Sequence, residues 1–432
     1  MSLWTDFGFR ENPYSAKQLP PTDEGETLLV GRDAELRRLK RVLTSTESHP
    51  TVEGDNGVGK SSLVAIAGYQ MMNAHGTGGI QELLIPLDRH FQLTAETTSD
   101  EFERNVYFAV AHAFIQHHKR IRNANFDMPD VGSIEPWLVK PQTRSGGGIA
   151  TPAGGVAGRD RTMNTSSGFD ESGFREAMRS WLRQTFPAPQ SGGFICVIDN
   201  LELLDTSQAA RKQLEEIRDS VLNTQGLRWV LCGARGIVRS AAASPRLSGL
   251  LAEPMEIGPI PDEFIPDVVD RRLEIYGHVS DPFVPVDGYG FLHIYHVLHR
   301  NLRDAFQYAE RFALWLDDSG FSPKTGEERF ELLEIWLTEQ ADASAAASTG
   351  VTPRAWEVFE RLQSDFGGAC SPGDFAHFGF TTTQAMRPHI RNLEDANLVK
   401  SKLTDDDKRR KTIGLTPAGW LVAYKRAGYR FI

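Results

Sequence analysis

Residues 54–62 read Gly-Asp-Asn-Gly-Val-Gly-Lys-Ser-Ser, and this stretch decides the fold. It matches the phosphate-binding pattern G-x-x-x-x-G-K-[ST], with Gly54, Gly59, Lys60 and Ser61 at the fixed positions. Glycines let the backbone curl until successive N–H groups point at phosphate oxygens. The lysine brings a positive charge to the β- and γ-phosphates, and the serine hydroxyl is a ligand for Mg²⁺. The stretch therefore predicts a site for ATP with Mg²⁺.

The residues on both sides of this loop support that interpretation. Residues 50–53 are typical of a short strand, and residues 60–73 are typical of a buried helix. The amino end of such a helix directs its positive dipole at a bound phosphate. We expect the nucleotide to contact the loop through Gly54, Asn56, Gly57, Val58, Gly59, Lys60, Ser61 and Ser62.

Short apolar strands alternate with helices from residue 50 onward, which is the pattern of a parallel sheet covered by helices on both faces. The expected strands are residues 50–53, 82–87, 194–198, 228–232 and 255–257. The expected helices are residues 60–73, 99–118, 171–185, 207–223 and 261–276. The sequence therefore predicts an α/β fold with a P-loop NTPase core.

Charge is distributed unevenly along the 432 residues, whose net charge is −10. Residues 351–432 hold 13 Lys and Arg against 9 Asp and Glu, so an acidic body carries a basic tail, which indicates an anionic partner for the tail. The three cysteines form no C-x-x-C pair, which fits a reducing cytoplasm. No apolar run reaches the roughly 18 residues needed to cross a bilayer, and no signal peptide is evident, so we expect a cytoplasmic protein without a membrane partner.

A second candidate site residue ends the strand at 194–198. Asp199 is expected to hold Mg²⁺ beside the loop, although an aspartate at this point also serves as a helix cap. Many ATPases of this kind have a glutamate next, which polarises the attacking water, whereas this chain has Asn200 and then Glu202. Either Glu202 reaches that water, or hydrolysis is slow and the protein acts mainly as a switch.

Residues 29–310 resemble the AAA+/STAND-type ATPases, with a layout similar to that of origin-recognition initiators and of bacterial signalling ATPases. The segment Val30-Gly31-Arg32, followed by Glu35, is similar to the family's Val-Gly-Arg-x-x-Glu motif. The resemblance implies that the backbone of this segment packs against the adenine, while the residues alone are also consistent with a simple turn before a helix.

The same resemblance assigns roles to arginines. Arg235 is similar to the arginine that STAND members place near the γ-phosphate, and Arg303 is similar to the lid arginine that reaches back to the nucleotide. Arg300 stands where the family usually has glycine. Arg246 is the candidate for an arginine finger supplied to a neighbouring subunit, which would require a homo-oligomer.

Changes in composition, together with the same resemblance, which implies the lid, predict four parts of the chain and a linker. An N-terminal arm covers residues 1–28, and its aromatic segment 7–14 is expected to dock on a neighbouring surface. The core covers residues 29–257, with a flexible Gly- and Ser-rich insertion at 141–170. A helical lid follows at 258–340, then a small-residue linker at 341–350, and the last unit covers 351–432.

The C-terminal unit resembles the winged-helix repressors of the multiple-antibiotic-resistance type. Its expected elements are helices at 352–366, 371–378 and 382–396, strands at 398–403 and 410–415, and a last helix from 416. The resemblance implies a helix in the major groove of duplex DNA and a wing on phosphates. The acids at 405–407 would repel DNA unless they face away, so a protein effector is the other candidate partner. The candidate DNA-binding residues are Arg387, Arg391, Lys408, Arg409 and Arg410.

Taken together, the motifs predict an ATP- and Mg²⁺-dependent switch whose nucleotide state repositions the winged helix. Lys60, Asp199, Glu202, Arg235 and Arg303 are the residues expected to carry hydrolysis. A slow or non-hydrolysing adaptor that engages a protein effector is the alternative, and a transcription regulator that senses energy state is a third candidate.

Overall fold

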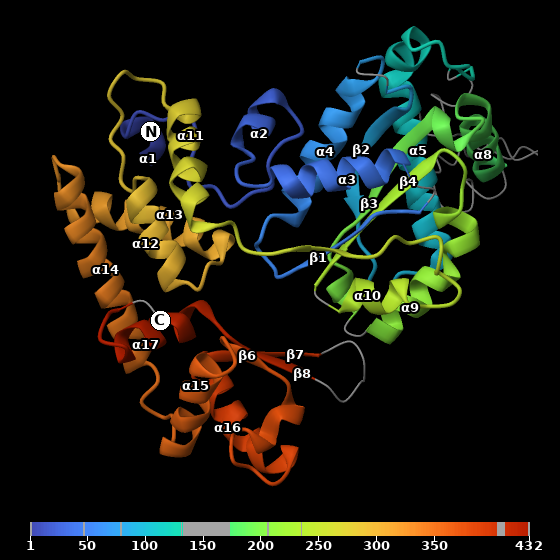
Figure 1. Ribbon diagram of the computed structural model, residues 1–432. Helices are drawn as coiled ribbons and strands as arrows, with labels where there is room; N and C mark the ends of the chain where they lie inside the picture. The colour runs from blue at the N-terminus through green and yellow to red at the C-terminus, as the bar shows by residue number, and fades with distance from the viewer. Residues whose placement is uncertain are drawn as a thin grey trace, which may run out of the picture.

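The computed structural model describes residues 2–45, 48–77, 80–130, 132, 173–204, 207–234, 236–403 and 411–430 (Figure 1). The insertion predicted at 141–170 lies outside these residues.

The core is built on a five-stranded sheet in the order β2-β3-β4-β1-β5, in which every neighbouring pair is parallel. The strands are β1 (Thr51–Gly54), β2 (Leu83–Phe91), β3 (Gly192–Ile198), β4 (Leu227–Gly233) and β5 (Met255–Ile257). The predicted α/β fold with a parallel sheet is confirmed. After β1 the chain crosses to β2 at one edge of the sheet, and β3 and β4 then fill the space between β2 and β1. The last strand, β5, lies on the other side of β1, so the connections run in opposite directions from β1. A crevice opens at the carboxyl end of such a strand.

Helices cover both faces of the sheet, as its alternating side chains require (Figure 1). One set of strand residues, including Ile195, Val197 and Val230, packs with α3 and α4. The alternate set, including Phe194, Cys196 and Trp229, packs with α5, α8, α9 and α10. The helices are α3 (Asp33–Ser45), α4 (Lys60–Ala74), α5 (Ser99–Asn123), α8 (Phe174–Thr185), α9 (Ser207–Glu216) and α10 (Ile237–Ala242). A π-helical segment, η4 (Arg218–Leu222), follows α9.

A buried histidine joins the sheet to this segment. His49 is 4% exposed, and its Nε2 lies 2.7 Å from the carbonyl oxygen of Leu222. The backbone N–H of Trp229 donates to its Nδ1 at 3.3 Å, so Nε2 carries the single proton. Burial lowers the pKa of His49 from 6.5 to about 4, because a charged imidazolium has no counter-charge there.

We expect the free energy of unfolding to fall as the pH drops from 6.5 towards 4. The unfolded chain protonates His49 near pH 6.5 whereas the folded chain does so only near pH 4, so acid favours unfolding by up to roughly 3 kcal/mol through this residue. Urea unfolding at about pH 7 and about pH 4.5 measures this. The variant His49→Gln should show a shallower pH dependence, and an unchanged pH dependence would contradict the assignment.

The helical lid follows β5 through the short helix η5 (Asp262–Phe264). It contains α11 (Ile265–Tyr276), α12 (Gly288–Val297), α13 (Leu302–Ser319) and α14 (Gly326–Ala346). The linker predicted at 341–350 is wrong over its first six residues, which form the last turns of α14 with Ala341 buried. Alanine has the highest helix propensity, and four of those six residues are alanine.

The N-terminal arm contains α1 (Leu3–Asp6) and α2 (Asp23–Leu28). The expectation that its aromatic segment docks is confirmed. Phe9 is fully buried and pairs through its backbone with Gly277. The hydroxyl of Tyr14, also fully buried, donates to the carbonyl of Val286 at 2.6 Å and accepts from its N–H at 3.0 Å. The arm is therefore held against the lid.

The C-terminal unit has the predicted helices and strands in the predicted order, and it also contains a short strand, β6, that was not predicted. They are α15 (Pro353–Ser364), β6 (Ala369–Cys370), η6 (Pro372–Ala376), α16 (Thr383–Asp395), β7 (Val399–Leu403), β8 (Lys411–Leu415) and α17 (Pro417–Arg426). The three strands form an antiparallel sheet in the order β6-β8-β7.

The last helix, α17, belongs to two hydrophobic cores. Leu421 and Tyr424 are buried in the core of the lid. Val422 and Ala423 are buried in the core of the C-terminal unit. In Figure 1, α17 lies beside α14, where the lid meets the C-terminal unit. Among the described residues, no helix has the length and apolar character needed to cross a bilayer.

Candidate nucleotide site

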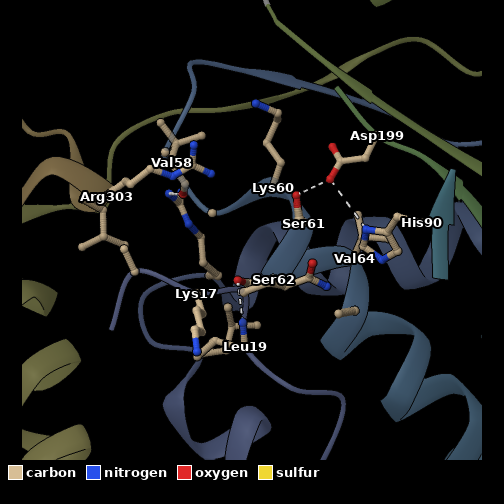
Figure 2. A pocket seen from close by; sticks show the side chains of 18 of the residues that line it. Lys17, Leu19, Val58, Lys60, Ser61, Ser62, Val64, His90, Asp199 and Arg303 are labelled. Carbon is tan, nitrogen blue, oxygen red and sulfur yellow. Dashed lines mark hydrogen bonds and ion pairs between the residues drawn. The ribbon is translucent and has the colours of Figure 1, made fainter. Parts of the chain in front are cut away.

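A cleft of about 500 Å³ lies at the carboxyl end of the parallel sheet. Its wall is made by the loop between β1 and α4, the ends of β2 and β3, the start of α13 and part of the N-terminal arm (Figure 2). The volume falls in the range of pockets for small molecules and cofactors.

The loop at 54–62 adopts a conformation that its glycines allow. Gly57 and Gly59 have φ values of +90° and +97°, which side chains disfavour. A Cβ on Gly57 would lie 2.5 Å from Oδ1 of Asn301, so the lid approaches the loop closely at this residue. All the loop residues from Asn56 to Ser62 line the cleft.

Lys60 is the first residue of α4 and is 6% exposed. Its Nζ donates to the carbonyls of Gly54 at 2.9 Å and Asp55 at 3.2 Å. The ammonium group therefore lies against the loop carbonyls at the amino end of the helix, where the helix dipole also attracts anions.

Asp199 follows β3 and lies opposite the start of α4. Ser61 Oγ donates to its Oδ2 at 2.5 Å, and the N–H of Asn200 donates to its Oδ1 at 2.9 Å. His90 Nδ1 lies 3.6 Å from the same Oδ2 (Figure 2). Burial alone would raise the pKa of Asp199, but the interactions with His90, Ser61 and Asn200 outweigh it and lower the pKa below its usual value.

This donor set fits Mg²⁺. A serine hydroxyl and an ionised carboxylate are hard oxygen ligands, and both stand at the mouth of a phosphate-binding loop. Ser61 and Asp199 would hold the ion, with Asp199 either in contact or through water.

Asn200 and Glu202, which both follow Asp199 in the sequence, differ in where they lie. Asn200 lines the cleft, and its φ of +57° turns the chain sharply after β3. Glu202 lies in the 3₁₀ helix η3 (Leu201–Leu204), where its Oε2 accepts a hydrogen bond from the N–H of Ala234 at 3.2 Å. Glu202 is not among the described residues that line the cleft, so its role in positioning water stays a prediction.

Of the arginines singled out by the sequence, the structure brings Arg303 to the cleft. Arg303 lies in the first turn of α13, and Figure 2 shows it beside Val58 of the loop. Arg300 instead pairs with Asp262 at 2.7 Å. Arg246 is exposed, with its NH1 3.9 Å from Glu215 Oε2. Arg235 lies outside the described residues.

The segment Val30-Gly31-Arg32 borders the cleft as well. Val30 and Arg32 are among the lining residues. Arg32 is 3% exposed, and its NH2 donates to the carbonyls of Val58 at 2.8 Å and Gly258 at 2.7 Å. The guanidinium thus ties the phosphate loop to the connection between core and lid.

Some lining residues were missed by sequence reasoning. Asp88 lies within the register shift between Pro86 and His90 of β2, His90 ends that shift, and Gln92 directly follows the strand. The alternation of polar side chains along this strand end was a usable signal.

Residues of the arm and lid were also missed. The N–H of Leu19 donates to Ser62 Oγ at 3.1 Å, which brings the arm to the start of α4. Lys17 lines the cleft beside it. Arg272, 5% exposed, donates to the carbonyl of Ser15 at 2.8 Å. No local pattern marks these long-range contacts.

The candidate DNA-binding residues divide between described and undescribed parts of the chain. Arg387 and Arg391 are exposed on α16, four residues apart and therefore on one face of the helix. Lys408, Arg409 and Arg410 lie outside the described residues.

No protein-family model matches the sequence, and no curated protein matches it either. Among solved structures, the chain is similar to the Orc1 protein of Aeropyrum pernix in complex with DNA, at 16% identity and a TM-score of 0.45, covering 97% of this chain and 98% of that one. It is similar to the ORC2 protein of the same organism in ADPNP–ADP complexes, at 10% identity and a TM-score of 0.47, with the same coverage.

A third similar structure is Cdc6p from Pyrobaculum aerophilum, at 13% identity and a TM-score of 0.39, covering 97% of this chain and 98% of that one. At these identities and TM-scores, no residue's role passes from those proteins to this one.

Proposed function

We propose that the chain is an ATP-binding molecular switch that hydrolyses ATP and acts on DNA through its C-terminal unit. The observation that supports this best is the meeting of Lys60, Ser61 and Asp199 at the carboxyl end of the sheet, with Ser61 and Asp199 joined at 2.5 Å. A buried lysine, a hydroxyl and an ionised carboxylate around a glycine loop suit a phosphate chain and its metal.

The proposed mechanism gives each side chain one task. The loop N–H groups and Lys60 bind the β- and γ-phosphates, and Ser61 and Asp199 orient the metal. Mg²⁺, when bound, neutralises charge that develops on the phosphate oxygens. Arg303 of the lid reaches the γ-phosphate, so loss of that phosphate releases the lid from the core. Arg235, which follows β4 in the sequence, is proposed to act on the same phosphate.

ATP turnover, measured with and without duplex DNA and alongside the mass of the particle, tests this proposal. The proposal is supported if DNA stimulates ATP turnover and if the affinity of the protein for DNA falls steeply as the salt concentration rises. A protein that binds no ATP contradicts it. The particle mass reports whether a homo-oligomer forms, which Arg246 would require as an arginine finger.

A second candidate is an adaptor that binds ATP but scarcely hydrolyses it and engages a protein effector. The hydrogen bond from the N–H of Ala234 to Glu202 favours it, because that carboxylate is occupied away from the cleft while Asn200 lines it. Tight ATP binding without turnover, with or without DNA, would support this candidate over the first.

The proposed DNA contact predicts the effect of changing α16. Replacing Arg387 and Arg391 by alanine should make the log–log salt dependence of DNA affinity shallower, by about one unit of slope for each phosphate that an arginine no longer neutralises. Fluorescence anisotropy with a duplex at several salt concentrations measures this. Arg122→Ala, an exposed arginine on α5 of the core, is the matched control. Equal slopes for the double variant and the control would contradict the DNA contact.

A further inference from the structure

The turn between α12 and α13 holds two residues in a costly backbone conformation. His299 and Arg300 have φ values of +52° and +59°, a region that residues other than glycine rarely adopt. The N–H of Arg300 donates to the carbonyl of Tyr295 at 2.7 Å, and its guanidinium pairs with Asp262 at 2.7 Å. Such conformations persist only where the surroundings impose them, and they gather at functional sites.

On one side this turn contacts the phosphate loop. Asn301 Nδ2 donates to the carbonyl of Asn56 at 3.2 Å. Its Oδ1 caps α13 by accepting from the N–H of Asp304 at 3.2 Å. A Cβ on Gly57 would lie 2.5 Å from that Oδ1 and 2.9 Å from Cβ of Arg303. The loop therefore cannot move towards the lid without displacing this turn.

On the other side the same turn contacts the C-terminal unit. The His299 ring stacks on the ring of Trp420 in α17, with centroids 3.9 Å apart and planes 9° apart. The backbone of Gly368 also lies against Trp420, because a Cβ on Gly368 would be 2.2 Å from its ring. Gly368 itself has a φ of +86°, so a glycine is needed there both for the backbone and for the ring.

We propose that residues 299–303 are the link by which the phosphate loop and the C-terminal unit sense each other. Asn301 is a positioning residue for the loop, and His299 is a positioning residue for α17. Within five residues the turn contacts the nucleotide cleft and the C-terminal helix, and it supplies Arg303 to the cleft. This inference rests on the proposed function, since it specifies how nucleotide at that site reaches the last unit.

The experiment measures hydrogen exchange of the α17 amides in the full chain, with and without a non-hydrolysable ATP analogue and Mg²⁺. His299→Asn removes the stacked ring but suits the positive φ. Asn301→Ser keeps a side chain able to cap α13 but removes the amide that reaches Asn56. His377→Asn is the matched control, because His377 lies in the C-terminal unit and its ring contacts Phe366 instead of the turn.

In the wild type and the His377→Asn control we expect the analogue to change α17 exchange several-fold. Both turn variants should still bind the analogue with an affinity within about tenfold of the wild type. A loss of that size is what removal of a typical coupling between two sites would cause. Their α17 response should fall to less than about a third of the wild-type response. Their melting temperatures without analogue show that they are folded.

Two results would overturn the link while leaving the proposed function intact. One is a full α17 response in both turn variants, and the other is a wild type that binds the analogue with no α17 response. A wild type that does not bind the analogue would instead remove the proposed function, and the link with it. Equal binding and an equally reduced response in the His377→Asn control would also overturn it, because the effect would then not belong to the turn.

Discussion

Replacing Lys60 by alanine is expected to lower the affinity for ATP by about 100-fold, or about 2.7 kcal/mol, and to remove turnover. The ammonium group is buried at the base of the loop, 2.9 Å from the Gly54 carbonyl. Because Lys60 has so little contact with solvent, a charge-assisted hydrogen bond from it to phosphate contributes more to the binding free energy than it would at the surface. Titration of a fluorescent ATP analogue and release of phosphate measure the two effects.

Lys40→Ala is the control for this prediction. Lys40 lies on α3 and donates to Gln70 at 2.7 Å, away from the residues that line the cleft. Its removal should leave ATP affinity within about twofold, since a polar pair at the surface contributes little to a distant site. If Lys60→Ala bound and hydrolysed ATP as well as Lys40→Ala does, the proposed nucleotide site would be wrong.

Tyr14→Ala is expected to cost about 3–5 kcal/mol of stability and to release the N-terminal arm. The ring is fully buried between arm and lid, and its hydroxyl satisfies both the N–H and the carbonyl of Val286. Removal of the ring leaves a cavity and two backbone groups without that partner. Because the arm also reaches Ser62 and the cleft, ATP binding should weaken in parallel.

Urea unfolding and limited trypsin digestion measure the two consequences, since Lys17 is exposed in the arm and becomes a preferred cleavage point once the arm is released. Tyr14→Phe separates the contributions, because it keeps the ring and loses only the hydroxyl, at a cost of about 1–3 kcal/mol. A Tyr14→Ala protein as stable and as resistant to trypsin as the wild type would show that the arm is not held in this way.

Much of the core was predictable because its signals are local. Hydrophobic periodicity predicts the alternation of strands and helices. Residue type predicts the role of the loop glycines and of Asp199 at a strand end. The fold class and the pairing of Ser61 with Asp199 could therefore be anticipated from the sequence, although the distance could not.

The rest depends on contacts between distant segments. The turn at His299 and Arg300 contains no glycine from which a positive φ could be predicted. Its side-chain partners, Trp420 and Asp262, lie in other parts of the chain. Arg272 shows the same limit, because its contact with Ser15 joins positions 257 residues apart. The error at 341–346 had a different origin, since small residues were interpreted as flexible although alanine favours helix.

The helix α17 is shared between two cores, so we expect the lid and the C-terminal unit to move together. Any rotation of the lid about its connection to β5 carries α17 with it, because Leu421 and Tyr424 are embedded in the lid. We expect a change of angle at the cleft to be carried to α16, on which Arg387 and Arg391 are exposed. We therefore expect the pivot of such a movement to lie between β5 and α11, well before the change of composition near residue 350.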